Sequence, residues 1–177
     1  CEKERVRLVL DECFVQFLTS GEEASMQLET GRFRYLFVLQ AFTKIYAVPG
    51  IRLGYGISSD KALLERMETV RQPWSVSTPA QAAGLSALKE DHREEQTRQL
   101  VKSERERMEK ELENLRIEYI PSEANFLLFN SEINWFEELK KRGILIRDCA
   151  NYRGLGNGWY RMAVRMPEEN DRLLECM

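Results

Sequence analysis

The sequence predicts an α/β fold in two parts joined by a long helical stretch, and three patterns lead to this prediction. Short runs rich in β-branched and other apolar residues alternate with segments of helical periodicity. A helical pattern covers residues 80–115. Further short strands and helices follow it, which is typical of a small α/β domain. We therefore expect a first part over residues 1–78, one or two interdomain helices over 79–115, and a small C-terminal α/β domain over 116–177.

The composition is that of an ordinary globular protein. Of its 177 residues, 43% are hydrophobic, which is enough for a compact core. The 26 lysines and arginines nearly balance 29 acidic residues, so no global charge recruits nucleic acid or anionic lipid. The single histidine, His92, lies in a charged run, which argues against a histidine-based metal site or a Ser-His-Asp triad. The four cysteines lack CxxC spacing, which favours buried thiols over a disulfide framework or a zinc site.

Three strands are predicted in the first part. Val6–Leu10 is an apolar run that ends at Asp11, the pattern of a buried parallel strand with an acid at its carboxyl end. Tyr35–Leu39 predicts a second buried strand, which leads to Lys44. Ile51–Ile57 predicts a third, and its two glycines indicate close approach of another backbone. Functional groups of α/β proteins gather at the carboxyl ends of strands, so the acid and the lysine are candidate site residues.

The remaining pattern alternates helices with short strands. Thr19–Arg34 is polar and helix-capable, Asp60–Arg71 predicts a helix, and Pro79 opens the long helical stretch. The charged run Lys102–Glu113 predicts a solvated helix face. Later strands are predicted at Ile117–Ile120, Asn125–Phe129, Ile144–Arg147 and Trp159–Val164, and later helices at Ile133–Arg142 and from Pro167 onward.

An acid, an amine and a guanidinium follow the first strands at short spacing. Asp11 can pair with a pyridinium nitrogen, and Lys44 can form a Schiff base with an aldehyde. Arg52 has a planar fork suited to phosphate, and Thr43 can add a hydroxyl donor. Pyridoxal 5'-phosphate (PLP) needs these three kinds of group from a protein. A surface lysine and a capping aspartate are the alternatives for each residue taken singly, whereas the combination is specific.

The segments LVLDECF (Leu8–Phe14) and AFTKIYAVPGIRLGYG (Ala41–Gly56) resemble the fold-type I PLP-dependent enzymes, the class I and II aminotransferase superfamily. The resemblance covers essentially the whole chain. It implies the C-terminal part of the PLP-dependent transferase large domain, with an incomplete sheet, plus a small α/β C-terminal domain. It also implies that Asp11 is the pyridinium aspartate, Lys44 the Schiff-base lysine and Arg52 the cofactor-phosphate arginine.

Later segments are most similar to the threonine-phosphate decarboxylase branch of that family. By this resemblance Arg161 grips the α-carboxylate of the substrate, Arg147 lies near its anionic end, and Asn125 lies near the substrate. Two cations suit a substrate with a carboxylate and a phosphate. Ion pairing with nearby acids is the alternative for the two arginines, and a turn cap is the alternative for Asn125. The segments are QPWSVSTP (72–79), SEANF (122–126), ILIRDCANYRGL (144–155) and WYRMAVR (159–165).

Two positions depart from the pattern of the aminotransferases. Phe14 stands where they usually have a tyrosine whose hydroxyl reaches the cofactor ring, and the decarboxylase branch resembles this sequence in accepting phenylalanine. Ala41 stands where many relatives place a serine or threonine that helps to hold the cofactor phosphate. Phe14 therefore favours decarboxylation, and Ala41 leaves more of the phosphate binding to Thr43 or to the expected chain before Cys1.

The resemblance implies decarboxylation of L-threonine O-3-phosphate to (R)-1-amino-2-propanol O-phosphate for cobalamin biosynthesis. A transaminase such as histidinol-phosphate aminotransferase is the second candidate, and a noncatalytic fragment is the third. The resemblance also implies a homodimer that binds a small phosphorylated amino acid. We expect further chain before Cys1, carrying a Gly-rich phosphate loop, and expect the chain alone to be inactive. No apolar stretch approaches the roughly 20 residues that span a bilayer and no signal peptide is recognised, so we expect a cytoplasmic protein.

Overall fold

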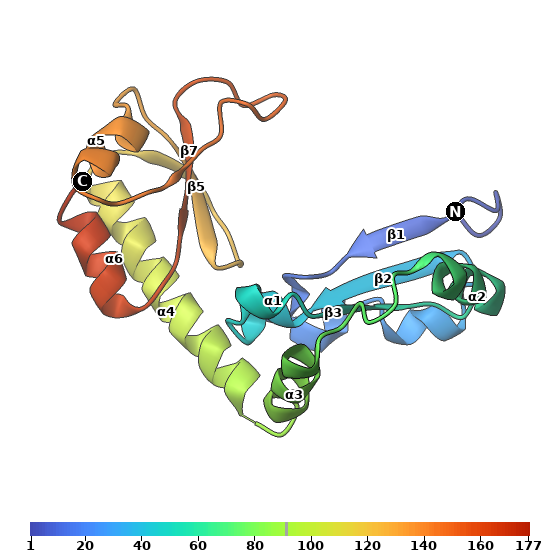
Figure 1. Cartoon of the computed structure of the whole chain (residues 1–177). Coiled ribbons are helices and arrows are strands. Elements are labelled where there is room, and N and C mark those ends of the chain that lie inside the picture. Colours follow the sequence, from blue (N-terminus) through green and yellow to red (C-terminus); the bar gives the residue numbers. More distant parts are fainter. Residues whose placement is uncertain (91) are drawn as a thin grey trace. The chain divides into compact units, whose positions relative to one another are not determined.

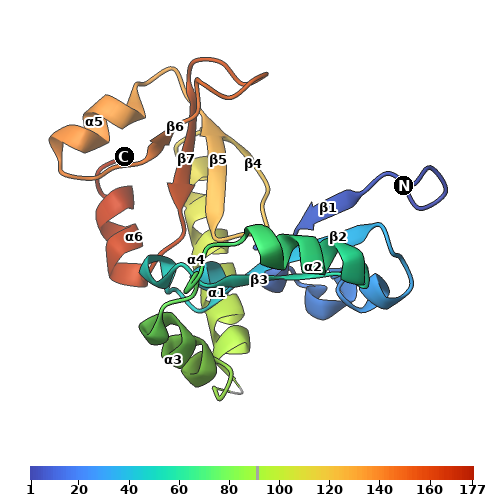
Figure 2. The ribbon, with the colours of Figure 1, turned by 45° about the vertical axis from the view of Figure 1, so that its right-hand side comes forward.

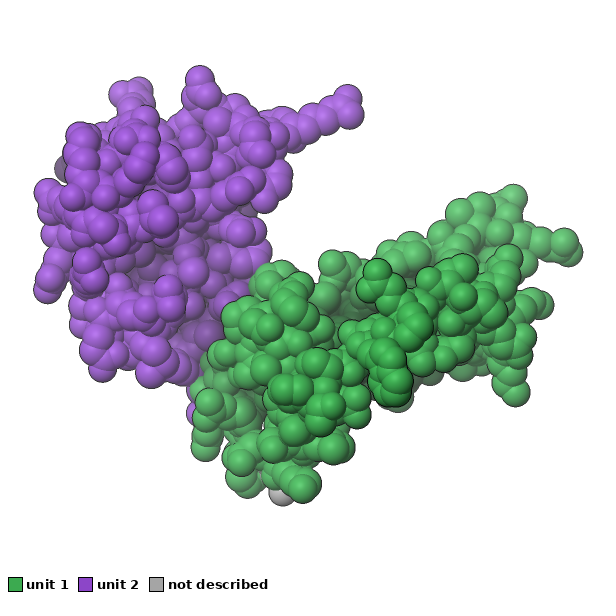
Figure 3. All heavy atoms as spheres, in the orientation of Figure 1, with its two compact units in different colours: residues 1–98 green, residues 99–177 purple. Residues whose placement is uncertain are grey.

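A computed structural model of the chain describes residues 1–90 and 92–177, apart from the side chain of Glu22. The chain forms two compact units, residues 1–98 and residues 99–177, which are coloured separately in Figure 3. Each unit has its own β-sheet, so the predicted α/β class is confirmed. The division between the units falls inside a helix, and the boundaries expected at 78/79 and 115/116 stay predictions.

The first unit contains a three-stranded sheet in the order β1-β2-β3 (Figure 1). Strand β1 (Leu8–Asp11) runs parallel to β2 (Leu36–Ala41), which confirms the predicted parallel pairing. Strand β3 (Gly54–Ile57) runs antiparallel to β2, with Gly54 opposite Ala41. The end of β1, the end of β2 and the start of β3 therefore share one edge of the sheet.

The two parallel strands differ in how deeply their side chains are buried. Leu36, Phe37 and Val38 of β2 are buried, as predicted. The prediction that the first strand is buried is wrong for this chain, because Val9 in the middle of β1 is 54% exposed. Strand β1 pairs with β2 along one edge and has no second neighbouring strand in the described part of the chain.

Strand β3 is shorter than the predicted run Ile51–Ile57. The short helix η4 (Pro49–Ile51) precedes it, and Arg52 has a positive φ of 58°, which a strand does not allow. The close approach predicted from the glycines is confirmed. A Cβ atom at Gly54 would lie 2.8 Å from the backbone oxygen of Gln40, so only glycine fits there.

Between β1 and β2 the chain forms three short 3₁₀ helices instead of the expected longer helix. They are η1 (Val15–Phe17), η2 (Gly21–Ala24) and η3 (Leu28–Gly31). Gly21 has a positive φ of 48°, which interrupts regular helix at this point. The predicted helical content of this segment is therefore present only as single turns.

The later helices of the first unit begin at or within two residues of the predicted starts, Asp60 and Pro79. The carboxylate of Asp60 accepts the backbone N–H of Leu63 and starts α2 (Lys61–Val70), and the hydroxyl of Ser77 accepts that of Ala80 and starts α3 (Thr78–Ala87). The single helix considered for residues 80–115 is two helices, α3 and α4 (Arg93–Asn114). His92 is exposed immediately before α4.

The second unit has a four-stranded antiparallel sheet in the order β4-β5-β7-β6 (Figure 2). The interior combines residues from the sheet and the helices, among them Leu127, Met162, Met108 and Leu139. The predicted elements are all present, although the predicted strand at Ile144–Arg147 is reduced to two residues. Their bounds are β4 (Glu118–Ile120), β5 (Phe126–Asn130), α5 (Trp135–Lys141), β6 (Arg147–Asp148), β7 (Trp159–Ala163) and α6 (Pro167–Leu174).

The charged run Lys102–Glu113 of α4 has the predicted solvated face, but two of its charged residues, Glu104 and Arg105, are buried. Glu104 is only 8% exposed and accepts hydrogen bonds from Asn170 in α6 (2.7 Å) and from Arg107 (2.7 Å). Arg107 also pairs with Asp171 of α6 at 2.7 Å. The Arg107 hydrogen bond is the main cause that holds the pKa of Glu104 below its usual value, and burial acts in the opposite direction. These contacts join α4 to α6.

Glu104→Ala is expected to lower the unfolding free energy of the second unit by about 1–3 kcal/mol, because it leaves the buried amide of Asn170 without this acceptor. The contribution of Glu104 is present at neutral pH and is lost as the pH falls through its lowered pKa. Urea unfolding followed by circular dichroism measures both effects. Glu106→Ala, on an exposed site of the same helix, is the control. Equal losses in the two variants would contradict the role of this cluster.

The cysteines only partly match the expectation of buried thiols. Cys149 is buried, whereas Cys1 is exposed and Cys13 and Cys176 are half-buried. All four are free thiols. No group of three metal-binding side chains occurs among the described residues. Within the same residues, no helix combines the length and apolar character needed to cross a membrane.

Candidate active site

The sheet of the first unit brings Asp11 and Lys44 to the same edge. Asp11 is the last residue of β1, and it lies beside Leu39 of β2. Strand β2 continues directly into the one-turn helix α1 (Phe42–Ile45), which carries Thr43 and Lys44. The sequence places these side chains here because the apolar run of β2 ends at Ala41 and the parallel pairing aligns the two strand ends.

The carboxylate of Asp11 is held in its ionised form. Its Oδ1 accepts the backbone N–H of Cys13 at 3.0 Å. Hydrogen bonding from Cys13 is the largest cause that lowers the pKa of Asp11, and the charge of Lys44 lowers it further. Conversely, burial and the Asp11 carboxylate raise the pKa of the Cys13 thiol to about 11. The carboxylate and the lysine therefore interact electrostatically at this edge.

Lys44 lies against an aromatic ring. Its Nζ is 5.4 Å from the ring centroid of Phe14, within the range of a cation–π interaction. Phe14 follows β1 by three residues, and no hydroxyl is available at this position to bind a ligand. The ring, the ammonium group and the Asp11 carboxylate form one local cluster.

Arg52 lies near the same edge, in the turn that precedes the antiparallel strand β3. The backbone N–H of Phe42 donates to the oxygen of Leu53, which fixes the turn before β3 against α1. The Arg52 guanidinium donates one hydrogen bond to the oxygen of Pro49 at 2.9 Å and is otherwise exposed. The predicted cofactor residues thus gather at one sheet edge by topology, with Arg52 on an exposed left-handed turn.

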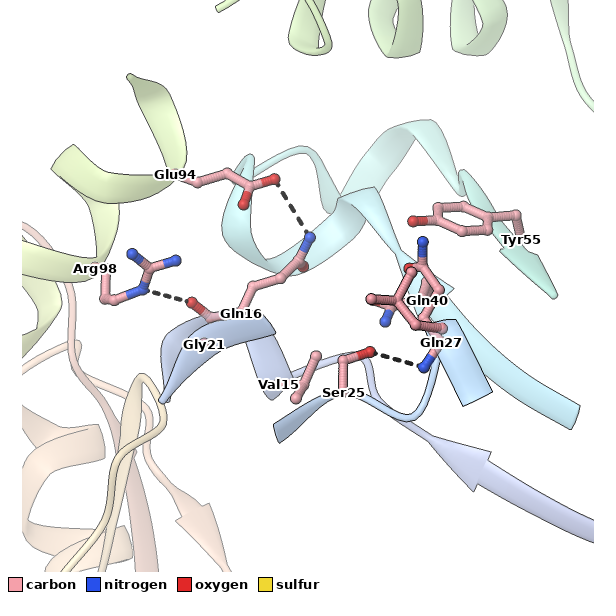
Figure 4. A pocket seen from close by; sticks show the side chains of 10 residues that line it. Val15, Gln16, Gly21, Ser25, Gln27, Gln40, Tyr55, Glu94 and Arg98 are labelled. Carbon is pink, nitrogen blue, oxygen red and sulfur yellow. Dashed lines mark hydrogen bonds between the residues drawn. The ribbon is translucent and has the colours of Figure 1, made fainter. Parts of the chain in front are cut away.

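The cavity drawn in Figure 4 is separate from this cluster. It lies beside η1, Gln40 and Tyr55 in the first unit, and it has a volume of about 260 Å³. Asp11, Lys44 and Arg52 are not among its lining residues. The candidate cofactor residues therefore lie at an open edge of the sheet and do not line that cavity.

In the second unit, the register of the sheet sets two predicted arginines opposite each other. Arg147 of β6 is the direct cross-strand partner of Arg161 in β7. Opposite residues lie on one face of a sheet, and Tyr160 and Met162 are buried on the other face. Two like charges in this position destabilise a strand pair unless an anion lies between them.

The alternative of structural ion pairing finds no support in the contacts of these arginines. Arg161 lies over the ring of Phe126 at 5.1 Å, and Arg147 donates to Asn151 at 3.3 Å. Within the described ranges 1–90 and 92–177, neither guanidinium has a carboxylate oxygen within 4 Å. Glu169, one of the acids considered as a partner, pairs with Arg165 at 2.9 Å instead. Arg165 therefore differs from Arg147 and Arg161 in having an acidic partner.

Asn125 lies at the beginning of β5. Its backbone oxygen accepts the N–H of Val164 at 2.9 Å, which extends the pairing of β5 with β7 beyond Phe126. Asn125 is thus on the strand next to Arg161, and it is half-buried. Its assignment as a substrate-binding residue stays a prediction.

Sequence reasoning missed the role of Glu12, which follows Asp11 directly. The side chain of Glu12 is buried and accepts the hydroxyl of Ser25 (2.6 Å), the backbone N–H of Met26 (2.8 Å) and the amide of Gln40 (3.0 Å). It fixes the end of β1 to β2 and to the segment before η3. The sequence feature that could have indicated this role is the Asp11-Glu12 pair at the end of a strand, where only one of the two acids can be exposed.

The comparison with known families covers almost the whole chain. The model of the family "aminotransferase class I and II" matches residues 1–176. The chain belongs to the class I and II aminotransferase family. This membership agrees with the sheet edge that gathers Asp11 and Lys44.

Individual relatives of this aminotransferase-family chain come from both expected branches. The threonine-phosphate decarboxylase of Salmonella typhimurium is 36% identical over 181 residues, covering 100% of this chain and 49% of that protein. Histidinol-phosphate aminotransferase 1 of Archaeoglobus fulgidus is 36% identical over 171 residues, covering 96% of this chain and 50% of that protein. The chain spans about half the length of these relatives.

Among solved structures, the histidinol-phosphate aminotransferase of Clostridium acetobutylicum is similar to the chain with a TM-score of 0.91 and 30% sequence identity. The similarity covers 99% of this chain and 54% of that one. The aminotransferase-family chain therefore has a partial PLP-dependent transferase fold, as predicted.

Proposed function

We propose that the chain is part of a PLP-dependent enzyme that decarboxylates L-threonine O-3-phosphate. The observation that carries this proposal is the cross-strand pair Arg147–Arg161, two exposed guanidinium groups without acidic partners among the described residues. A substrate with both a carboxylate and a phosphate supplies the two anions that such a pair favours. The identity of 36% to a threonine-phosphate decarboxylase supports the same substrate class.

The residues of the first unit fit PLP. Asp11 is ionised and lies close enough to Lys44 for their charges to interact, so a carboxylate is available for a ring nitrogen. The single hydrogen bond of Arg52 to Pro49 leaves most of its donors available for a phosphate, with the hydroxyl of Thr43 beside Lys44 as a further donor. Bound PLP supplies an electron-withdrawing ring that makes the bonds at the α-carbon of an amino acid breakable.

The roles of the chain's own residues follow from this arrangement. Lys44 would attach the cofactor and then use its free amine to deliver a proton to the α-carbon after carbon dioxide leaves. Asp11 would keep a proton on the ring nitrogen. Arg161 would bind the α-carboxylate, and Arg147 and Asn125 would position the phosphate end of the substrate. In the parent protein, (R)-1-amino-2-propanol O-phosphate would serve cobalamin biosynthesis.

Phe14 adds support for decarboxylation. Its ring lies against the ammonium group of Lys44. By the resemblance described above, aminotransferases of this family usually have a tyrosine, with its hydroxyl, at this position. Phenylalanine offers no hydrogen bond to the ring oxygen of the cofactor. The reaction proposed here does not require that hydrogen bond.

A histidinol-phosphate aminotransferase is the second candidate, because one specific observation favours it. The fold is similar at a TM-score of 0.91 to a histidinol-phosphate aminotransferase. The two enzymes would share Asp11, Lys44 and Arg52 and would differ in the final product.

The deciding experiment assays the longer parent protein with each substrate. The proposal predicts release of carbon dioxide from L-threonine O-3-phosphate without a keto-acid acceptor. A keto product that depends on 2-oxoglutarate, with no carbon dioxide, would establish the aminotransferase instead. The 177-residue chain alone is expected to show no PLP absorbance band and no borohydride-trapped adduct at Lys44, as the noncatalytic alternative requires.

Arg161→Ala in the parent is expected to lower kcat/KM by about 10–100-fold, mainly through KM, because one charged hydrogen-bonding partner of the substrate is lost. Steady-state kinetics with L-threonine O-3-phosphate measures this effect. Arg165→Ala is the matched control, since Arg165 lies two residues along the chain and already pairs with Glu169. An equal loss in both variants would assign Arg161 a structural role.

A further inference from the structure

We propose that Glu94 is a positioning residue for Lys44, because one of its oxygens holds both the turn that carries the lysine and the segment that contacts it. Glu94 lies in the first turn of α4, within the first unit. This role rests on the function proposed above, since a lysine without chemistry needs no exact position. Glu94 itself supplies no group to the reaction.

Helix α1 does not fix the position of Lys44 by itself. It has only four residues, and a single turn gains too few backbone hydrogen bonds to be stable alone. Ala47, which follows closely, has a positive φ of 54°, so the helix does not continue. Phe42 and Ile45 are buried, whereas Lys44 is half-buried. Side-chain contacts therefore hold this turn in place.

Tyr46 ties the turn to α4. Its ring stacks on that of Phe42, with the centroids 5.2 Å apart, and its hydroxyl donates to Oε1 of Glu94 at 2.5 Å. Burial and the Glu94 carboxylate raise the pKa of Tyr46, so the hydroxyl keeps its proton and remains a donor. Tyr46 is the C-cap of α1, two residues after Lys44. Its hydrogen bond therefore fixes the end of the turn that carries the lysine.

Gln16 ties the other segment to the same oxygen. Its Nε2 donates to Oε1 of Glu94 at 3.4 Å, and Figure 4 shows this amide directed at Glu94. One turn along α4, Arg98 donates to the backbone oxygen of Gln16 at 3.0 Å. Gln16 lies two residues after Phe14, whose ring centroid is 5.4 Å from Nζ of Lys44. The start of α4 thus holds the segment whose aromatic ring contacts the lysine.

The hydrogen bonds to Glu94 set where the amine of Lys44 lies. Proton delivery needs this amine within reach of the α-carbon of the substrate, and a displacement of about 1 Å can cost about 10²-fold in rate. Contacts that only stabilised the fold would change the unfolding free energy without moving the amine in the folded protein. Folded variants therefore distinguish a positioning role from a structural one.

Two single substitutions break the hydrogen bond from either side. Tyr46→Phe keeps the stacked ring and removes only the hydroxyl, and Glu94→Ala removes the acceptor. In the longer parent protein each is expected to lower kcat by about 10–100-fold with little change in KM, because the lysine is displaced while the substrate-binding arginines are not. The double variant is expected to lose about as much as Glu94→Ala alone, because both changes break one interaction.

Two further variants separate the hydrogen bond from the charge and from the loss of any hydroxyl. Glu94→Gln removes the charge but keeps an oxygen that can accept both hydrogen bonds, so it is expected to recover most of the kcat that Glu94→Ala loses. Tyr35→Phe is the matched control. Tyr35 precedes β2, at the end of the strand opposite Lys44, and its variant should keep the parental kcat.

A readout without PLP follows the position of Lys44 directly. In the 177-residue chain, NMR measures the contact between the ε-methylene protons of Lys44 and the ring protons of Phe14. This contact is expected to be lost in Tyr46→Phe and Glu94→Ala and retained in Glu94→Gln and Tyr35→Phe. Circular dichroism checks that each variant is folded, and Tyr46→Phe keeps the test decisive if Glu94→Ala does not fold.

A lost contact together with a lowered kcat would support the positioning role. An intact contact in folded Tyr46→Phe would overturn it, whatever the kcat, and so would a lost contact with parental kcat. Failure of the proposed function gives a different result. If the parent transaminates instead of releasing carbon dioxide, the same kcat comparison applies to that reaction, and the NMR readout requires neither reaction.

Discussion

Lys44→Ala in the longer parent protein is expected to reduce turnover of L-threonine O-3-phosphate by at least ~10³-fold, because the proposed proton donor and point of cofactor attachment are both lost. The lysine lies at the sheet edge beside the ionised Asp11, on a helix of a single turn that follows β2. No other lysine occurs between residues 4 and 60, so no neighbouring amine can take its place. Steady-state assay of carbon dioxide release measures the loss.

Two further measurements separate a chemical loss from a folding defect. Lys61→Ala removes an exposed lysine from the first turn of α2 and should retain parental activity and parental absorbance of bound PLP. Added methylamine is expected to restore part of the activity of Lys44→Ala, because a free amine can replace the missing group. Parental turnover by a folded Lys44→Ala variant would refute the assignment of Lys44 and, with it, the proposed chemistry.

The candidate cofactor residues could be predicted from the sequence because each of them lies at, or within a few residues of, the end of a strand. Asp11 ends an apolar run, and Lys44 follows the next strand by three residues. Two parallel strands that end in this way bring their following residues to one edge. The lengths of the strands were less predictable, since the positive φ of Arg52 removes three residues from the predicted third strand.

The features missed from sequence depend on contacts between distant residues. Glu104 is buried because Asn170, 66 residues later, donates to it, and a helical charge pattern contains no sign of that partner. The cross-strand pairing of Arg147 with Arg161 depends on the register of the two-residue strand β6. Likewise, the side-chain amides of Gln16 and Gln40 donate to Glu94 and Glu12, which are distant in the sequence. The periodicity of a sequence shows which face of a helix or strand is apolar, whereas these contacts can be identified only in the folded structure.

Asp11→Asn is expected to lower turnover of the parent protein by about 10²–10⁴-fold, because a neutral amide cannot keep a proton on the ring nitrogen of the cofactor. The substitution is structurally mild. Oδ1 of asparagine can still accept the N–H of Cys13, which Asp11 now accepts at 3.0 Å, so the end of β1 should keep its conformation. The thiol of Cys13 offers an internal check. Since the Asp11 carboxylate contributes to the raised pKa of about 11, that pKa should fall toward its ordinary value in the variant.

A matched change elsewhere distinguishes loss of this carboxylate from a general loss of charge. Asp171→Asn removes one of the acids that pair with Arg107 in the second unit and should leave turnover nearly unchanged. If Asp11→Asn keeps parental turnover while the pKa of Cys13 falls, the carboxylate contacts the thiol but not the cofactor. The ring nitrogen would then need another partner. If turnover falls and PLP stays bound, the carboxylate acts on the chemical step, because binding through Lys44 and Arg52 does not require the charge of Asp11.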